Sequence, residues 1–136
     1  MDQESARAAL QHYLDCSAAG DEDRAHEVYL EDAILEFPQS GERFEGIPNF
    51  RAWRRDYPAK VELEIRRIRG GGDVWTAEVA VSYDGGPRNY GVSILEFRGD
   101  KIARETIYYA EAFKAPDWRA RWRAAPPRQP TDGGGP

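Results

Sequence analysis

The sequence predicts an α+β fold in which three helices near the start of the chain pack on a curved antiparallel sheet. Two patterns lead to this prediction. Before residue 58, apolar residues recur three or four positions apart, and beyond it they alternate with polar residues. Glycine-rich turns separate the alternating segments. The order helix, helix, strand, helix and four strands is typical of helices that cover one face of a sheet.

The first two helices are predicted from their apolar faces and their ends. Apolar side chains follow helical spacing over residues 5–17, and an Ala-Ala-Gly stretch then stops the helix. Asp21 is placed to cap a second, shorter helix, whose buried side would consist of Ala25, Val28 and Tyr29.

A short strand and a third helix complete the first part of the chain. Residues 33–37 form an apolar strand candidate that Pro38 ends. Residues 47–57 are predicted to form a helix with Pro48 in its first turn, because the fixed φ of proline suits that position. Pro58 closes this helix.

The sheet is predicted from four segments beyond residue 58. Their side chains alternate between apolar and polar, as in strands with one buried face. Glycine and aspartate are concentrated between them, at the positions of tight turns. We expect strands near residues 61–65, 75–83, 88–98 and 101–113, with turns at 70–73, 84–87 and 99–100.

The end of the chain differs in composition from the rest. Residues 115–122 are expected to form a short helix with Trp118 and Trp122 on one side, which would pack over the mouth of the domain or onto a second subunit. Residues 124–136 are rich in proline and glycine, so we expect a disordered tail. The single domain then covers residues 1–123.

Composition limits the classes of partner. The 136 residues are 40% hydrophobic and 32% charged, which is typical of one globular domain. The net charge of -5 disfavours nucleic acid, because phosphate binding needs a basic surface. The chain holds no run of about 20 apolar residues and no secretory signal at its start. We therefore expect a cytoplasmic protein that binds neither nucleic acid nor a membrane.

Metal, cofactor and nucleophilic chemistry have little support in the sequence. His12, Asp15 and Cys16 share one helix, but a metal site needs ligands that converge from more than one element. The only other histidine is His26, and there is no second cysteine. We expect no metal and no organic cofactor. Three arginine clusters, among them the one at residues 51–55, are interpreted as solvated faces with ion pairs.

Four stretches of the chain resemble a known superfamily. They are residues 13–21 (YLDCSAAGD), 29–38 (YLEDAILEFP), 92–102 (VSILEFRGDKI) and 105–110 (ETIYYA). Their order and spacing are similar to those of the NTF2-like superfamily, and within it the SnoaL-like group that contains polyketide cyclases and ketosteroid isomerase. The resemblance covers residues 5 to 113. It implies a cone-shaped barrel with an apolar pocket between helices and sheet, and often a homodimer formed through the outer face of the sheet.

The resemblance to ketosteroid isomerase does not extend to its catalytic set. Tyr13 matches the tyrosine that hydrogen-bonds the developing enolate. The base position, just before Pro38, holds Phe37, which cannot move a proton, and the position of the protonated aspartate holds Ser93. A typical steroid isomerase is therefore not expected. The related epoxide hydrolases carry an aspartate where this chain has Ile107, so that activity is not expected either.

Glu105 is the carboxylate that we expect in the pocket. The family pattern turns it inward together with Ile107 and Tyr109, whereas simple hairpin pairing across residues 99–100 predicts the opposite face. A bulge near Ala103 would reconcile the two. In an apolar cavity beside Tyr13, burial would raise the pKa of Glu105 toward the range useful for acid-base catalysis. The alternative is a structural glutamate paired with an arginine.

The remaining candidates are mainly aromatic. Large rings at these positions either fill the core or form the wall of a site for a flat, apolar ligand. Two functions stay open: a cofactor-free enzyme of the isomerase or cyclase type acting on a small hydrophobic metabolite, and a non-catalytic binding or assembly module. The residues expected to contact the ligand are Phe37, Trp53, Tyr57, Trp75, Tyr83, Ser93 and Tyr109, and those expected to be catalytic are Tyr13 and Glu105.

Overall fold

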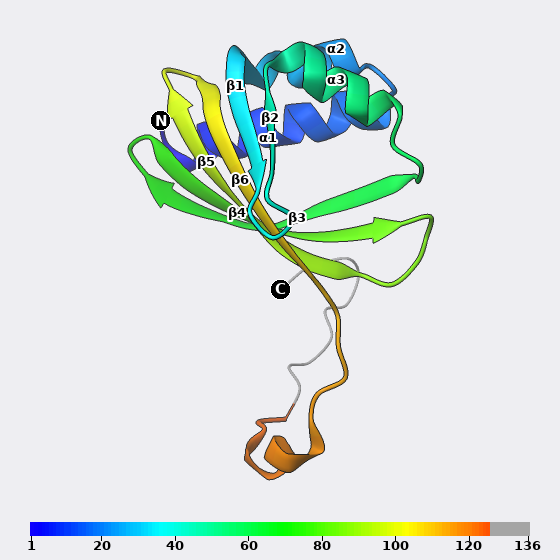
Figure 1. Ribbon diagram of the computed structural model, residues 1–136. Coiled ribbons are helices and arrows are strands. Elements are labelled where there is room, and N and C mark those ends of the chain that lie inside the picture. Colours follow the sequence, from blue (N-terminus) through cyan, green and yellow to red (C-terminus); the bar gives the residue numbers. More distant parts are fainter. Residues whose placement is uncertain (126–136) are drawn as a thin grey trace.

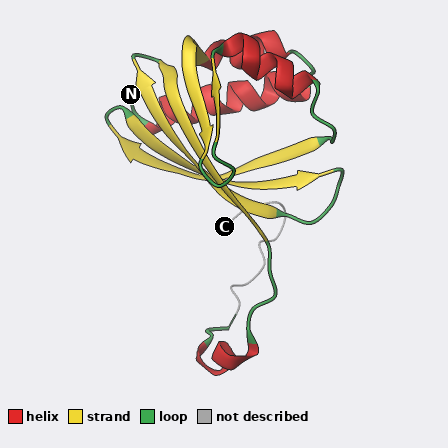
Figure 2. Ribbon diagram, in the orientation of Figure 1, coloured by secondary structure: helices red, strands yellow, loops and turns green. Residues whose placement is uncertain are grey.

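The computed structural model describes residues 1–125 as a curved sheet with helices on its concave side (Figure 1). Figure 2 shows the same arrangement by element type. The helices and strands follow in the order α1 (Gln3–Ala18), α2 (Glu22–Ala25), the 3₁₀ helix η1 (His26–Val28), β1 (Tyr29–Phe37), β2 (Glu42–Glu45), α3 (Ile47–Arg55), β3 (Val61–Gly71), β4 (Val74–Tyr83), β5 (Asn89–Arg98), β6 (Lys101–Glu111) and the 3₁₀ helix η2 (Asp117–Trp122).

The six strands form one sheet in the order β2-β1-β6-β5-β4-β3. All neighbours are antiparallel except β1 and β6, which run parallel, so the expectation of a purely antiparallel sheet was wrong at this pair. β2 was not expected at all, because its short, mostly charged sequence lacks an apolar alternation. The sheet is open, with β2 and β3 at its edges, and does not close into a barrel.

The second predicted helix is shorter than expected. α2 ends at Ala25, η1 follows for three residues, and Tyr29 already belongs to β1. The reason lies in the burial pattern from residue 29 onward: Tyr29, Ala33 and Leu35 are buried, and two exposed acidic residues lie between the first two. The strand therefore begins four residues earlier than the apolar run at 33–37 indicated.

The helix ends follow the predicted capping chemistry. The side chain of Asp21 accepts a hydrogen bond from the backbone N–H of Arg24 at 3.1 Å, which satisfies a free donor at the start of α2. Pro48 lies in the first turn of α3, as predicted. Gly46 lies directly before α3 and has a φ of 87°, a conformation that favours glycine. It turns the chain from β2 into α3.

A bulge in β6 fixes which side chains face the helices. Glu96 pairs with Arg104 but Phe97 pairs with Ile102, so one extra residue, Ala103, is inserted in β6. This insertion lets Ile102 and Glu105 point to the same concave side although they are three positions apart, which in a regular strand would place them on opposite faces. The bulge expected near Ala103 is thus confirmed.

The C-terminal segment lies apart from the rest of the chain. It leaves β6 and runs away from the sheet to η2 (Figure 1). Phe113, Trp118 and Trp122 are 78%, 73% and 65% exposed. The expected α-helix is a 3₁₀ helix, and its tryptophans do not cover the mouth of the domain. Apart from positions 124 and 125, the predicted tail lies outside the described residues.

None of the helices within residues 1–125 is both long and apolar enough to span a membrane. A cytoplasmic location stays a prediction from the sequence.

Candidate active-site cavity

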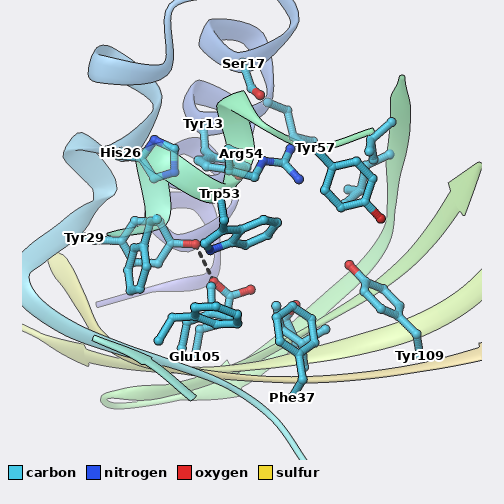
Figure 3. A pocket seen from close by; sticks show the side chains of 18 of the residues that line it. Tyr13, Ser17, His26, Tyr29, Phe37, Trp53, Arg54, Tyr57, Glu105 and Tyr109 are labelled. Atoms are coloured by element: carbon cyan, nitrogen blue, oxygen red, sulfur yellow. Dashed lines mark hydrogen bonds between the residues drawn. The ribbon is translucent and has the colours of Figure 1, made fainter. Parts of the chain in front are cut away.

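A cavity of about 820 Å³ lies between the concave face of the sheet and the helices (Figure 3). Its walls come from α1, η1, α3 and all six strands. Most of the residues singled out in the sequence line it, and they come from segments far apart along the chain. These residues are Tyr13, Phe37, Trp53, Tyr57, Tyr83, Ser93, Glu105 and Tyr109.

Trp75 is the exception among the expected ligand contacts. Its side chain is only 4% exposed and belongs to the packed hydrophobic core rather than to the cavity wall. The indole N–H donates a 3.0 Å hydrogen bond to the carbonyl oxygen of Gly72 in the adjacent turn. The alternation of β4 correctly placed Trp75 on the inner face of the sheet. Trp75 lies at the start of β4, however, and there core side chains fill the space between sheet and helices.

Glu105 extends into the cavity from the middle of β6. Its neighbours across the sheet are Leu35 on β1 and Leu95 on β5, both buried, so its immediate surroundings are apolar. The hydroxyl of Tyr29 donates a hydrogen bond to Oε1 at 2.5 Å. No arginine within residues 1–125 forms an ion pair with Glu105, so the arginine-paired alternative is wrong for the described part of the chain.

Burial raises the pKa of Glu105 above its ordinary value, because the charged carboxylate loses hydration. Hydrogen bonds from Tyr29 and Ser93 and the positive charge of Arg54 act in the opposite direction but do not outweigh it. The carboxyl group can therefore hold a proton at a pH where an exposed glutamate has lost its own.

Tyr13 lies on the helix side of the cavity, whereas Glu105 extends into it from the sheet (Figure 3). Its ring makes edge contacts with His26 and Tyr29, with centroids 5.7 and 6.2 Å apart. Burial raises the pKa of Tyr13 to about 12, which keeps its hydroxyl protonated as a hydrogen-bond donor. That hydroxyl donates to no group of residues 1–125, so it is free to bind a polar atom in the cavity.

Aromatic rings form the remaining walls. Phe37 packs at right angles to Phe44, which lies against Trp53 at 5.6 Å between centroids. Tyr57 and Tyr83 stack at 6.0 Å with an interplanar angle of 12°. Flat surfaces of this kind favour a flat, apolar occupant.

Several wall residues were not identified from the sequence as site residues, among them Arg54, Tyr29, Phe44 and His26. Arg54 was assigned to a solvated arginine cluster, and Tyr29 was placed on the second helix. Phe44 lies in the unexpected β2, and His26 was considered only as a metal ligand. Two of them carried a usable signal: Tyr29 begins one of the stretches shared with the superfamily, and Arg54 shares a helical face with Phe50 and Tyr57.

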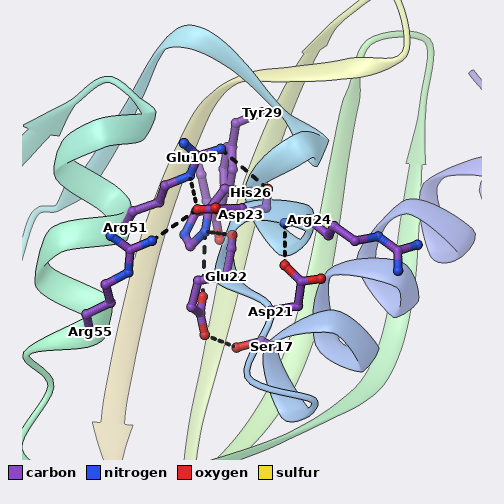
Figure 4. A network of polar contacts seen from close by, with 10 residues as sticks. All are labelled: Ser17, Asp21, Glu22, Asp23, Arg24, His26, Tyr29, Arg51, Arg55 and Glu105. Atoms are coloured by element: carbon purple, nitrogen blue, oxygen red, sulfur yellow. Dashed lines mark hydrogen bonds and ion pairs between the residues drawn. The ribbon is translucent and has the colours of Figure 1, made fainter.

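The polar contacts around α2 explain why Arg54 turns inward while its neighbours do not (Figure 4). Arg51 and Arg55 both pair with Asp23, at 3.3 and 3.0 Å, and so tie α3 to α2 on the outside. Arg54 lies on the other face of the helix, toward the cavity. The expectation of a solvated cluster was right for two of these arginines and wrong for Arg54.

His26 and Glu22 form the inner part of the same network (Figure 4). The hydroxyl of Ser17 donates to Oε1 of Glu22 at 2.8 Å, and Nδ1 of His26 lies 2.7 Å from the carbonyl oxygen of Glu22. Burial lowers the pKa of His26, so the ring tends to be neutral. These contacts join α1 to α2 and α2 to η1, and so stabilise the helix side of the cavity.

The family of the chain follows from its sequence match. The family model described as "SnoaL-like domain" matches residues 10–105, more than half of the chain. The chain therefore belongs to the SnoaL-like domain family, within the NTF2-like superfamily. A comparison with curated proteins gives no match.

Solved structures agree with this assignment. An NTF-2 like protein of unknown function from Burkholderia xenovorans LB400 is 44% identical, with a TM-score of 0.80 over 90% of this chain and 96% of that one. A Kribbella flavida DSM 17836 protein provisionally named a ketosteroid isomerase is 25% identical, with a TM-score of 0.79 over 93% of each chain. An epoxide hydrolase from M. tuberculosis, described as LEH-like, is 20% identical with a TM-score of 0.64 over 79% and 84%, and shares the fold.

Proposed function

We propose that this chain binds a small hydrophobic metabolite in the cavity and catalyses a proton transfer next to a carbonyl group, in cofactor-free chemistry of the isomerase or cyclase type. The observation that carries the proposal is the buried carboxyl group of Glu105, which faces an open cavity and is bound to Tyr29 rather than to an arginine.

The roles follow from the surroundings of each group. Glu105 exchanges the proton, and its raised pKa suits that role because a base works best when its pKa is near the working pH. Tyr29 acts as a positioning residue, since it holds Oε1 of Glu105 in place. Tyr13 donates a hydrogen bond to the carbonyl oxygen as negative charge develops there.

Phe37 separates this arrangement from that of ketosteroid isomerase. It occupies the position of the usual base and lines the cavity, so the proton-transferring group moves from β1 to β6. The carbon that loses a proton must then lie next to Glu105 on β6, in a cavity whose wall includes the aromatic rings of Phe44 and Trp53.

Deuterium exchange tests the proposed chemistry without knowledge of the natural substrate. The probe is 2-tetralone, a flat bicyclic ketone, whose hydrogens next to the carbonyl are followed by proton NMR in D₂O. We expect the protein to accelerate exchange, and Glu105→Gln to slow it by about 10²-fold or more, as for loss of a general base. Glu96→Gln, on the outer face of β5, is the matched control and should exchange like the unmodified protein.

The outcomes separate the two functions. Equal exchange rates with Glu105→Gln and Glu96→Gln would remove Glu105 from the mechanism. Binding of the ketone, seen as broadening of its NMR lines, without any acceleration of exchange would instead support the non-catalytic binding module.

A homodimer through the outer face of the sheet is part of the proposal. Tyr90 and Tyr108 are 42% and 41% exposed on that face, and the partly exposed Val92 and Ile94 follow Tyr90 along β5, with Val92 opposite Tyr108. An exposed patch of this kind is typical of a protein–protein contact. The association stays a prediction.

A further inference from the structure

Arg54 is a charged residue that the proposed chemistry does not use. It projects from α3 into the cavity and is partly covered, with its guanidinium 5.4 Å from the centroid of the Trp53 ring. In Figure 3 it lies on the helix side, whereas Glu105 rises from the sheet. A cation in such a place requires an explanation, because burial of an unpaired charge is unfavourable.

Arg54 forms no ion pair of its own within residues 1–125. No carboxylate of that part of the chain lies within 4.0 Å of its guanidinium, whereas Arg51 and Arg55 on the same helix share Asp23. The nearby tyrosines and Glu22 raise the pKa of Arg54 despite its burial, so it stays charged. The cavity wall also carries Lys60, Glu42 and Glu62, so the positive charge is local, and it is the helix side around Arg54 that favours an anionic group of the occupant.

Two uncharged groups of the wall can donate hydrogen bonds as well. The indole N–H of Trp53 is buried without a hydrogen-bond partner. The hydroxyl of Tyr13 is free among the described residues, and the Glu105 carboxyl group already accepts from Tyr29. An occupant that matches this wall brings acceptors of hydrogen bonds.

We infer that the ligand carries a carboxylate, held by Arg54 on the helix side of the cavity, on a flat aromatic or polycyclic body that reaches Glu105. This inference rests on the proposed function and names its substrate class. A carboxylate fits better than a phosphate, because one guanidinium matches its two oxygens and its single charge. The stacked rings of Tyr57 and Tyr83 flank the space for the body.

The arrangement also sets the orientation of the ligand. With its carboxylate bound at α3, the ligand places its opposite end toward β6, where the carboxyl group of Glu105 lies (Figure 3). Arg54 is thus a binding and positioning residue, and the proton is transferred at the other side of the cavity.

Two matched probes test this inference: 2-naphthoate and its neutral isostere 2-naphthamide, titrated calorimetrically at neutral pH. We expect the carboxylate to bind at least about tenfold tighter than the amide, as for one charge-assisted contact. Arg54→Gln should abolish this preference and leave the affinity for the amide unchanged, while Arg54→Lys retains part of it. Arg55→Gln removes the same charge from the outside of α3 and should preserve the preference.

Each result decides between the inference and the function on which it rests. If the amide binds as tightly as the carboxylate, or if Arg54→Gln and Arg55→Gln weaken carboxylate binding equally, the inference is wrong while the cavity remains a binding site. If neither probe binds, the proposed function fails together with the inference. Thermal unfolding of each variant, compared with the unmodified protein, shows that a loss of binding is not a loss of fold.

Discussion

At the scale of single residues, the surroundings of Glu105 set its protonation. Leu35 and Leu95 flank it in the sheet, and the hydroxyl of Tyr29 is the group that holds it. Because burial raises its pKa, the folded chain keeps a proton that the unfolded chain releases. The free energy of unfolding therefore decreases as pH rises from the ordinary value of 4.5 through the raised value.

Sequence reasoning reached some of these residues and missed others for a physical reason. Glu105 was predicted because the family pattern and a bulge agree on its face, and Phe37 because it precedes a strand-ending proline. Arg54 was missed because the sequence cannot show that Asp23, on another helix, binds the neighbouring arginines. Such pairings across elements leave no mark in local periodicity.

At the scale of elements, the position of the Tyr109 ring in the cavity wall depends on a glycine in the neighbouring strand. Gly91 on β5 pairs with Tyr109 on β6, and the tyrosine ring lies directly over it. A Cβ at position 91 would come within 2.2 Å of the ring and 2.5 Å of the carbonyl oxygen of Tyr108. The absence of a side chain therefore lets the ring fold over the strand and line the cavity.

We predict that Gly91→Ala destabilises the protein by about 1–3 kcal/mol, because the added methyl group displaces both the ring and the strand. Gly71→Ala, at the end of β3, is the control, since nothing lies within 4 Å of its Cβ. Urea unfolding followed by circular dichroism measures both. Equal changes in the free energy of unfolding would show that the close contact at position 91 has no energetic consequence.

The elements that sequence reasoning misjudged share a cause. β2 is a strand because Glu42 to Glu45 pair with the end of β1, and the first half of β1 is a strand because Tyr29 pairs with Ile102 of β6. Pairing with segments distant in the sequence outweighs the low β-strand propensity of charged residues. The β3–β4 and β5–β6 hairpins were predicted correctly because their turns, at Gly72 and Gly99, are local signals.

At the scale of the whole molecule, two surfaces are left for contact with other chains. One is the outer face of the sheet around Tyr90 and Tyr108, and the other is the C-terminal segment with Trp118 and Trp122. The first surface is part of the regular sheet, so two identical chains can bring the same patch together in a symmetric dimer. The domain's own fold covers neither surface.

We predict a dimer in sedimentation velocity experiments at micromolar concentration, and mainly monomer for Tyr108→Arg, because a charge in the centre of the contact must be buried unpaired. Gln11→Arg adds the same charge on the exposed side of α1 and should leave the dimer intact. A monomeric unmodified chain would refute the dimer but would not affect the cavity, whose described wall residues all belong to one chain.

The most direct measurement of the central claim is a pH titration of the Glu105 side-chain carboxyl carbon by ¹³C NMR, with its signal assigned from the spectrum of Glu105→Gln. A carboxyl group enclosed by leucines and held by a tyrosine should titrate above 4.5, and 2-naphthoate should shift its signal. A titration at or below 4.5 that no cavity ligand affects would show that Glu105 is solvated and that the cavity is not an acid-base site.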